Sequence, residues 1–289
     1  MESIREIRAV LAMELRRALK SGRVIVLLAL YSMFSLLVLF VVGGVSSKIR
    51  EGGGVDAAGG AVALRDRLLG FLFSDDPAML DALRDIPMVV LIVFQAALLF
   101  LPLYVAIMGF DQISGEVGPR SMRYLAVRAR RSSVLFGKVA AQAVLLWGLL
   151  GVVHLAVFAY AGGTDPDFTL RLAIPTGLKF WLASAVFCLA YLGLTAACST
   201  LFRTPAMSLT CNALVLFAFP LLNFLGSVNT ASPTEKGPLS YLGYLSPSHY
   251  ALDLLHPYLS RFGLSAAALA GFVALFLGIA YGVLRERDL

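Results

Sequence analysis

Charged residues are scarce in this chain. Asp, Glu, Lys and Arg make up 15% of its 289 residues, whereas soluble domains average about 25%. Hydrophobic residues make up 59%, and the mean hydropathy is +0.82. Such a shortage of charge indicates that lipid replaces water over much of the surface, which excludes an ordinary soluble domain. The net charge of +6 fits cytoplasmic loops that face anionic headgroups, so no nucleic acid is needed to explain it.

Signatures of catalysis are also missing. The sequence has no G-x-x-x-x-G-K-[ST] phosphate loop and no H-E-x-x-H zinc motif. Its three histidines, His154, His249 and His256, are scattered, and its three cysteines lie in apolar stretches that suit small buried side chains. We therefore expect no nucleotide site of that kind, no metal site and no enzymatic activity in this chain.

Long apolar runs are what the sequence has in place of charge. A membrane-spanning helix needs about 20 apolar residues, and a lone strand would leave its backbone groups unpaired in lipid. The sequence therefore predicts an all-α integral membrane protein with a six-helix transmembrane domain over residues 24–289. The six predicted spans are Val24–Val45, Ile86–Phe110, Val139–Ala161, Phe180–Phe202, Ala206–Gly226 and Leu264–Leu284.

Basic residues predict the orientation. Fifteen of the 24 Lys and Arg residues lie in the N-terminal segment, the second and fourth loops and the C-terminal tail, and the first loop carries seven acids. Because basic residues gather on the cytoplasmic side, we expect both termini in the cytoplasm and a multi-pass protein of the bacterial cytoplasmic (inner) membrane.

The first 23 residues form a separate unit in this prediction. Apolar residues fall on one face of a helix over Ser3–Arg23 and basic residues mostly fall elsewhere. This pattern predicts an amphipathic helix that lies along the inner leaflet before the first span, in contact with the lipid bilayer. A solvated, merely basic start of the chain is the alternative. The apolar face consists of Ile4, Ile7, Leu11, Leu15 and Ala18.

Two external loops carry features of their own. In the first, Ala61–Phe73 is predicted to be a short amphipathic helix, and Asp75-Asp76-Pro77 is predicted to begin another that ends before Pro87. This acidic loop is a candidate contact for a periplasmic or extracellular partner, with a solvated cap as the alternative. In the last loop, Ser248–Leu259 is apolar enough to lie in the interface or to dip into the protein.

The predicted spans hold almost no ionisable groups, which argues against a carrier driven by protons or sodium ions. His154 is the exception deep in the membrane. Neutral polar residues in the spans suit either interhelical hydrogen bonds or a mildly polar pathway. The candidate pathway residues are Gln95, Gln142, His154, Asn212 and Asn223.

The second cytoplasmic loop is where a partner could supply energy instead. Phe110-Asp-Gln-Ile-Ser-Gly-Glu-Val-Gly-Pro-Arg-Ser-Met-Arg-Tyr-Leu125 leaves the membrane, breaks at Gly118-Pro119 and can restart as a short helix, and Gly137-Lys138 marks re-entry. Asp111 and Glu116 are the two acids of a loop with six bases. A loop that served topology alone would need the bases but not this order of acid, turn and helix.

This order of residues resembles ABC-2 type transporter permeases, the membrane subunits of one class of ABC exporter. The matching residues are Asp111, Ser114-Gly115-Glu116, Ser121-Met122, Leu125, Arg131 and Gly137-Lys138, and Leu245-Ser-Pro-Ser-His-Tyr250 before the last span also fits. The chain departs from the family at Arg120, where a small Gly usually stands, and lacks the Pro of a Pro-x-x-Arg turn.

The resemblance implies a permease subunit of an ATP-driven exporter that forms its pathway with a second permease copy or a paralogue. It implies a separate ABC ATP-binding subunit as partner, which would hold ATP and Mg, with no cofactor in this chain. The 111–131 loop would couple to that ATPase, with the N-terminal helix beside it as a connecting helix. The implied coupling residues are Asp111, Glu116, Arg120, Ser121, Arg123, Arg131 and Lys138. The alternative is a non-transporting scaffold or sensor that binds a partner or anionic lipid through the same basic loop.

Overall fold

The structure is a computed structural model that describes residues 2–20, 22, 25–26, 29–38, 40, 65–73, 76–117, 129–164, 168–228 and 238–287. All regular elements in these ranges are helices, as the sequence predicts. The longer ones are α1 (Glu2–Lys20), α5 (Met88–Gly109), α8 (Arg131–Thr164), α9 (Leu170–Leu201), α10 (Pro205–Val228) and α11 (Leu259–Glu286). The short ones are Ala29–Val38, residues 65–72, α4 (Pro77–Leu83), α6 (Ser114–Val117), and the 3₁₀ helices η1 (Pro238–Leu245), η2 (Pro247–Tyr250) and η3 (Leu252–Leu255).

In the part of the chain that the structure describes, five helices are long and apolar enough to cross a membrane, and they coincide with the last five predicted spans. Within the first predicted span, 24–45, the described part includes a ten-residue apolar helix, Ala29–Val38, so a sixth crossing stays a prediction. Hydropathy placed the start of α8 at Val139, yet the helix begins at Arg131. It begins earlier because its first two turns pack against another helix and need no apolar run to be helical.

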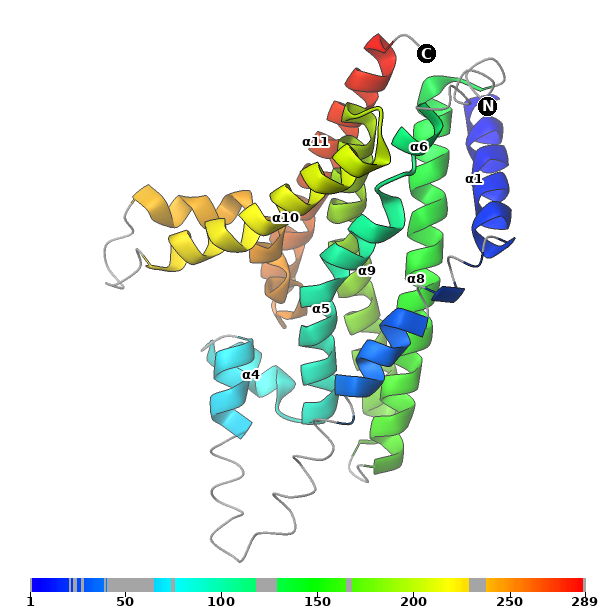
Figure 1. Cartoon of the computed structure of the whole chain (residues 1–289). Coiled ribbons are helices and arrows are strands. Elements are labelled where there is room, and N and C mark those ends of the chain that lie inside the picture. The colour runs from blue at the N-terminus through cyan, green and yellow to red at the C-terminus, as the bar shows by residue number, and fades with distance from the viewer. Residues whose placement is uncertain are drawn as a thin grey trace, which may run out of the picture.

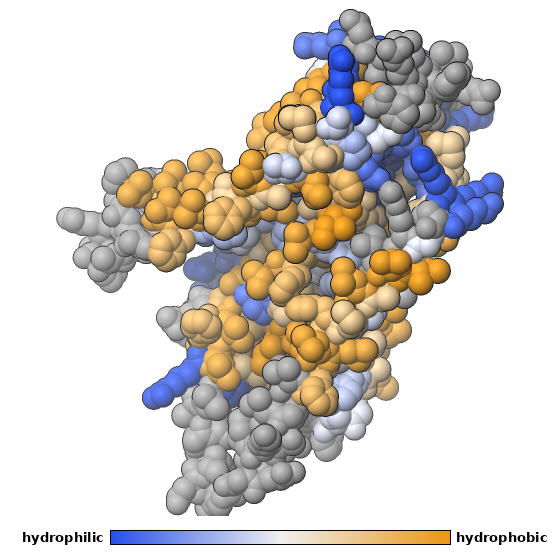
Figure 2. Space-filling view, in the orientation of Figure 1, coloured by the Kyte–Doolittle hydropathy of each residue, from blue (hydrophilic) through white to orange (hydrophobic). Residues whose placement is uncertain are grey.

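Helix α9 forms the centre of the bundle, with α5, α8, α10 and α11 around it. Small residues on α9 let its neighbours come close: a Cβ atom added to Gly193 would lie 3.3 Å from Cβ of Phe276 on α11. In α10 and α11, by contrast, most of the apolar surface faces away from the chain. Figure 2 shows this apolar surface over the body of the bundle, with hydrophilic side chains mostly toward the ends.

Both termini lie at the same end of the bundle, together with α6 and the start of α8 (Figure 1). An even number of crossings would give this arrangement. The side of the membrane on which this end lies stays a prediction from the basic residues.

Helix α4 lies toward the opposite end of the bundle (Figure 1), while η1 and η2 pack beside α10. Asp76 caps α4 as predicted: its side chain accepts a hydrogen bond from the N–H of Ala78 at 3.0 Å, and Pro77 follows at the first helical position. The segment Ser248–Leu259 dips into the protein, because Leu254 and Leu255 are fully buried. Residues 51–64, the first part of the predicted external loop, lie outside the described residues.

Candidate functional site

The turn after α5 is fixed to the central helix. The backbone N–H groups of Ile113 and Ser114 both donate to Oγ of Ser199 on α9, at 2.9 and 3.0 Å. Ile113, Ser114 and Ser199 are all fully buried. One serine hydroxyl thus satisfies two backbone donors that would otherwise be lost at this turn, and it sets the position of α6 relative to α9.

Glu116 on α6 stands in a charged cluster that joins three elements. Its Oε1 accepts from Nζ of Lys138 on α8 at 2.9 Å and from Nη1 of Arg17 on α1 at 2.8 Å. Nζ of Lys138 also donates to Oε1 of Glu14 on α1 at 2.6 Å. We call these four residues, Glu14, Arg17, Glu116 and Lys138, the charged junction.

Burial makes Lys138 the centre of the charged junction. Its side chain is 1% exposed, against 10% for Glu116 and 17% for Glu14. The charges of the two carboxylates and the two cations sum to zero. Both carboxylates lie within hydrogen-bonding distance of the buried ammonium group. Arg17 is 67% exposed, so its bond to Glu116 contributes less than that of Lys138.

Close packing of α1 on α8 brings the charged junction together. A Cβ atom added to Gly137 would lie only 2.7 Å from Cβ of Val10, so a larger residue at 137 would push α1 away. At the start of α8, the backbone N–H of Arg130 donates to Oε2 of Glu6 at 3.1 Å. This bond, with that of the Ser133 hydroxyl, lowers the pKa of Glu6. Glu6 therefore acts as a cap for a helix that it precedes by more than a hundred residues.

This packing also refines the prediction for the N-terminal helix. A helix is present, but Ile7, Leu11 and Leu15 of the predicted apolar face are half-buried, on the side of α1 that also carries the buried Val10. Figure 1 shows α1 running alongside the first turns of α8. Its contact with the inner leaflet stays a prediction.

Arg131 lies at the same end of the bundle but has different partners. Its Nη1 donates to the backbone oxygens of Leu284, Arg285 and Arg287 at 2.8 to 2.9 Å, where α11 ends. Arg287 in turn donates to the backbone oxygens of Thr200 and Phe202 at the end of α9, at 2.6 and 3.4 Å. Two guanidinium groups thus cap two helix C-termini in sequence and tie α8, α11 and α9 together.

The structure brings some of the implied coupling residues together and not others. Glu116 and Lys138 pair directly, Arg131 reaches α11, and Asp111 is half-buried in the turn before α6. The remaining three, Arg120, Ser121 and Arg123, lie outside the described residues. Sequence reasoning missed Glu14 and Arg17. A signal existed, because helical spacing places Glu14, an acid, on the same face of α1 as the apolar Leu11 and Ala18, and one turn before Arg17.

The candidate pathway residues do not form one cluster. Gln142 and Thr195 meet at Gly109, where an added Cβ would lie 3.0 Å from Oε1 of Gln142 and 2.8 Å from Cγ2 of Thr195. Asn212 donates to Oγ1 of Thr195 at 2.9 Å, which is an interhelical hydrogen bond between α10 and α9. These residues therefore serve helix packing at this point.

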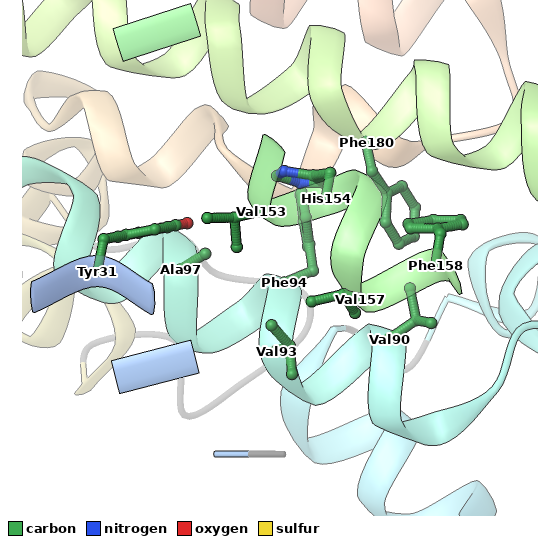
Figure 3. Close-up of a pocket in the computed structure, with 10 residues that line it drawn as sticks. All are labelled: Tyr31, Val90, Val93, Phe94, Ala97, Val153, His154, Val157, Phe158 and Phe180. Atoms are coloured by element: carbon green, nitrogen blue, oxygen red, sulfur yellow. The ribbon is translucent and has the colours of Figure 1, made fainter. Parts of the chain in front are cut away.

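The other three candidates lie apart. Asn223 donates to Oγ of Ser248 at 2.7 Å and so ties α10 to η2. Oε1 of Gln95 is buried and has no hydrogen-bond partner among the described residues. His154 hydrogen-bonds through Nδ1 to the backbone oxygen of Leu150 at 2.8 Å and lines a small aromatic pocket between the helices (Figure 3).

The fold and the charged junction together define a class: a multi-pass helical membrane protein with a polar joint at the end where its termini meet. Comparison with known families places it within that class. The family model for ABC-2 family transporter proteins matches residues 8–289, and the chain belongs to this family. It is therefore a permease component of an ABC transporter. Membership of this family implies an ATP-binding partner. A search of curated proteins found no match.

Proposed function

We propose that this chain is the permease subunit of an ATP-driven exporter, and that it couples to a separate ATPase subunit through its 111–131 loop. The observation that carries the proposal is the charged junction, which joins α6, the one helix described in that loop, to α1 and α8. The ATP and Mg belong to the partner subunit. Both termini lie in the cytoplasm of a bacterial cell, below its cytoplasmic membrane.

The charged junction supports a lever mechanism. A short helix of four residues such as α6 cannot hold its own orientation by backbone hydrogen bonds alone. Glu116 fixes it from one side through Lys138 and Arg17, and Ser199 fixes the turn before it from the other. A force that the ATPase applied to the loop would therefore reach α1, α8 and α9 together. Asp111, Arg120, Ser121 and Arg123 are the residues proposed to contact the ATPase.

A second permease copy or a paralogue completes the pathway in this proposal. Exposed apolar side chains are dense on α10, where Leu214 is 67% and Phe217 74% exposed, and this surface would face either lipid or the second copy. Because the spans are nearly free of charge, the cargo is hydrophobic or amphipathic. The first external loop is the proposed contact for a periplasmic partner.

Co-purification tests the coupling part of the proposal. The wild-type chain, extracted in mild detergent or nanodiscs, is expected to bring down an ATPase, and Glu116→Ala and Arg131→Ala are expected to lose it or to uncouple its ATP hydrolysis. Asp66→Ala is the matched control, because it removes a carboxylate from an exposed ion pair with Arg84. If no ATPase accompanies the wild type, the proposal is wrong, and binding of the loop to anionic vesicles would then favour the scaffold or sensor alternative.

A further inference from the structure

The aromatic pocket around His154 contains a polar group, the hydroxyl of Tyr31, that no described residue satisfies. The pocket lies between Ala29–Val38, α5, α8 and α9, and its walls include Phe94, Phe158 and Phe180. Tyr31, which is 3% exposed, closes one side. Its hydroxyl is buried and has no hydrogen-bond partner among the described residues. A buried hydroxyl without a partner is costly, so a bound molecule that accepts a hydrogen bond from it would be stabilised here.

His154 supplies the complementary group. Its Nδ1 lies 2.8 Å from the backbone oxygen of Leu150, and because a carbonyl oxygen can only accept, Nδ1 carries the proton. In the neutral ring Nε2 is then an acceptor. Figure 3 shows the Tyr31 hydroxyl and the nitrogen-bearing edge of His154 on the same side of the pocket, with Val153 between them in this view.

We infer that this pocket binds a small phenol or a similar ring alcohol. A ligand hydroxyl both accepts and donates, so it can accept from the Tyr31 hydroxyl and donate to Nε2 of His154. The ring of the ligand would pack against the phenylalanine side chains, which pack edge to face or tilted on one another, as in the pair of Phe94 and Phe180 at 4.5 Å between centroids. A carboxylate or an ammonium is a poor occupant, because the pocket offers no opposite charge.

Entry requires the helix that carries Tyr31 to move. The cavity measures about 10 Å³, which is room for one water molecule and not for a ring. In Ala29–Val38 only Tyr31 and Ser35 are buried, while Leu30, Met33, Leu36 and Leu37 are exposed. This helix therefore presents its apolar side outward and covers the pocket with a single ring. An outward shift of it opens the pocket toward lipid, where an uncharged phenol partitions.

Equilibrium binding of radiolabelled 4-propylphenol to the purified full chain tests the inference. Tyr31→Phe removes only the hydroxyl and is expected to raise Kd about fivefold, the effect of one hydrogen bond. Tyr104→Phe is the matched control: Tyr104 is buried beside Tyr31, with ring centroids 5.6 Å apart, but does not line the pocket, so Kd is expected to stay unchanged. The methyl ether 4-propylanisole, which cannot donate to His154, is expected to bind more weakly than the phenol.

Two results would overturn the inference: equal binding of the phenol and its ether, or an unchanged Kd in Tyr31→Phe. A photoreactive alkylphenol gives an independent measurement, because it is expected to label residues 90–97 or 153–158, and labelling confined to other helices would contradict the site. Neither measurement involves an ATPase, so the pocket and the coupling proposal can fail separately.

Discussion

Replacing Lys138 by Met is expected to lower the free energy of unfolding more than replacing a charged residue of an exposed ion pair does. Methionine keeps the length of the side chain but removes the cation that lies within 2.9 Å of both Glu14 and Glu116. Removing one partner of a fully buried ion pair costs about 3–5 kcal/mol. Here Glu14 and Glu116 keep some contact with water and Arg17 remains bound to Glu116, so we expect about 2–3 kcal/mol.

Thermal unfolding in detergent, followed with a thiol-reactive dye, measures this loss. Cys188 and Cys198 are buried and free, so they react as the bundle opens. A loss of that size corresponds to a midpoint lowered by about 5 °C or more. Asp66→Asn breaks only an exposed pair and is expected to lower the free energy of unfolding by less than about 1 kcal/mol.

A double-mutant cycle separates the ion pair from general damage to α8. Glu116→Gln combined with Lys138→Met is expected to cost less than the sum of the two single losses, by about 1–3 kcal/mol, because either change alone already breaks the bond. Additive effects, or a Lys138→Met midpoint no lower than that of Asp66→Asn, would refute the view that this pair holds the junction together.

Three further predictions concern other contacts. Gly137→Ala is expected to loosen α1 and to speed its cleavage by trypsin, whereas Gly148→Ala, which has open space around it, is expected to leave cleavage unchanged; equal rates would contradict the close approach. The pKa of Asp76 is lowered, chiefly by its hydrogen bond with His256. The carboxylate therefore stabilises the fold at pH above its usual pKa of 3.8, and this stabilisation is lost as the pH falls through the lower pKa of the folded state. The resistance of α4 to protease is expected to fall over that pH range in the wild type and to stay constant in Asp76→Asn. Arg131→Gln and Arg287→Gln are each expected to speed hydrogen exchange at the end of their capped helix by about tenfold, and unchanged exchange would show that the caps contribute nothing.

Local patterns in the sequence predicted the elements of the fold well. The long apolar runs identified five of the helices because lipid burial needs no long-range information. The start of α4 at Asp76-Pro77 was equally local, since a cap and its helix are adjacent in sequence. The start of α8 was predicted too late because hydropathy reports where lipid begins and not where a helix begins.

Contacts between distant residues were beyond the sequence. Glu116 and Lys138 were singled out, but nothing in their spacing predicted that Glu14 would complete the charged junction from a helix 124 residues away. Arg131 was assigned to the same site, and the structure shows its Nη1 bound to three carbonyl oxygens at the end of α11, more than 150 residues away in sequence. The pathway candidates were chosen for polarity alone. Gln142 and Thr195, the residue to which Asn212 donates, both approach Gly109 because a glycine leaves room between α5, α8 and α9.

The charged junction also constrains how the protein is made. Glu14 leaves the ribosome 124 residues before Lys138, a delay of about 6 to 25 s at ordinary rates of synthesis. During that time α1 has no α8 to pack on, and its two acidic side chains toward α8, Glu6 and Glu14, remain in water. Helix α1 can pack on α8 only after α8 has been inserted with its basic end on the same side of the membrane as α1. An inverted α8 would carry Lys138 across the bilayer, so docking of α1 reports that the chain has inserted in the correct sense.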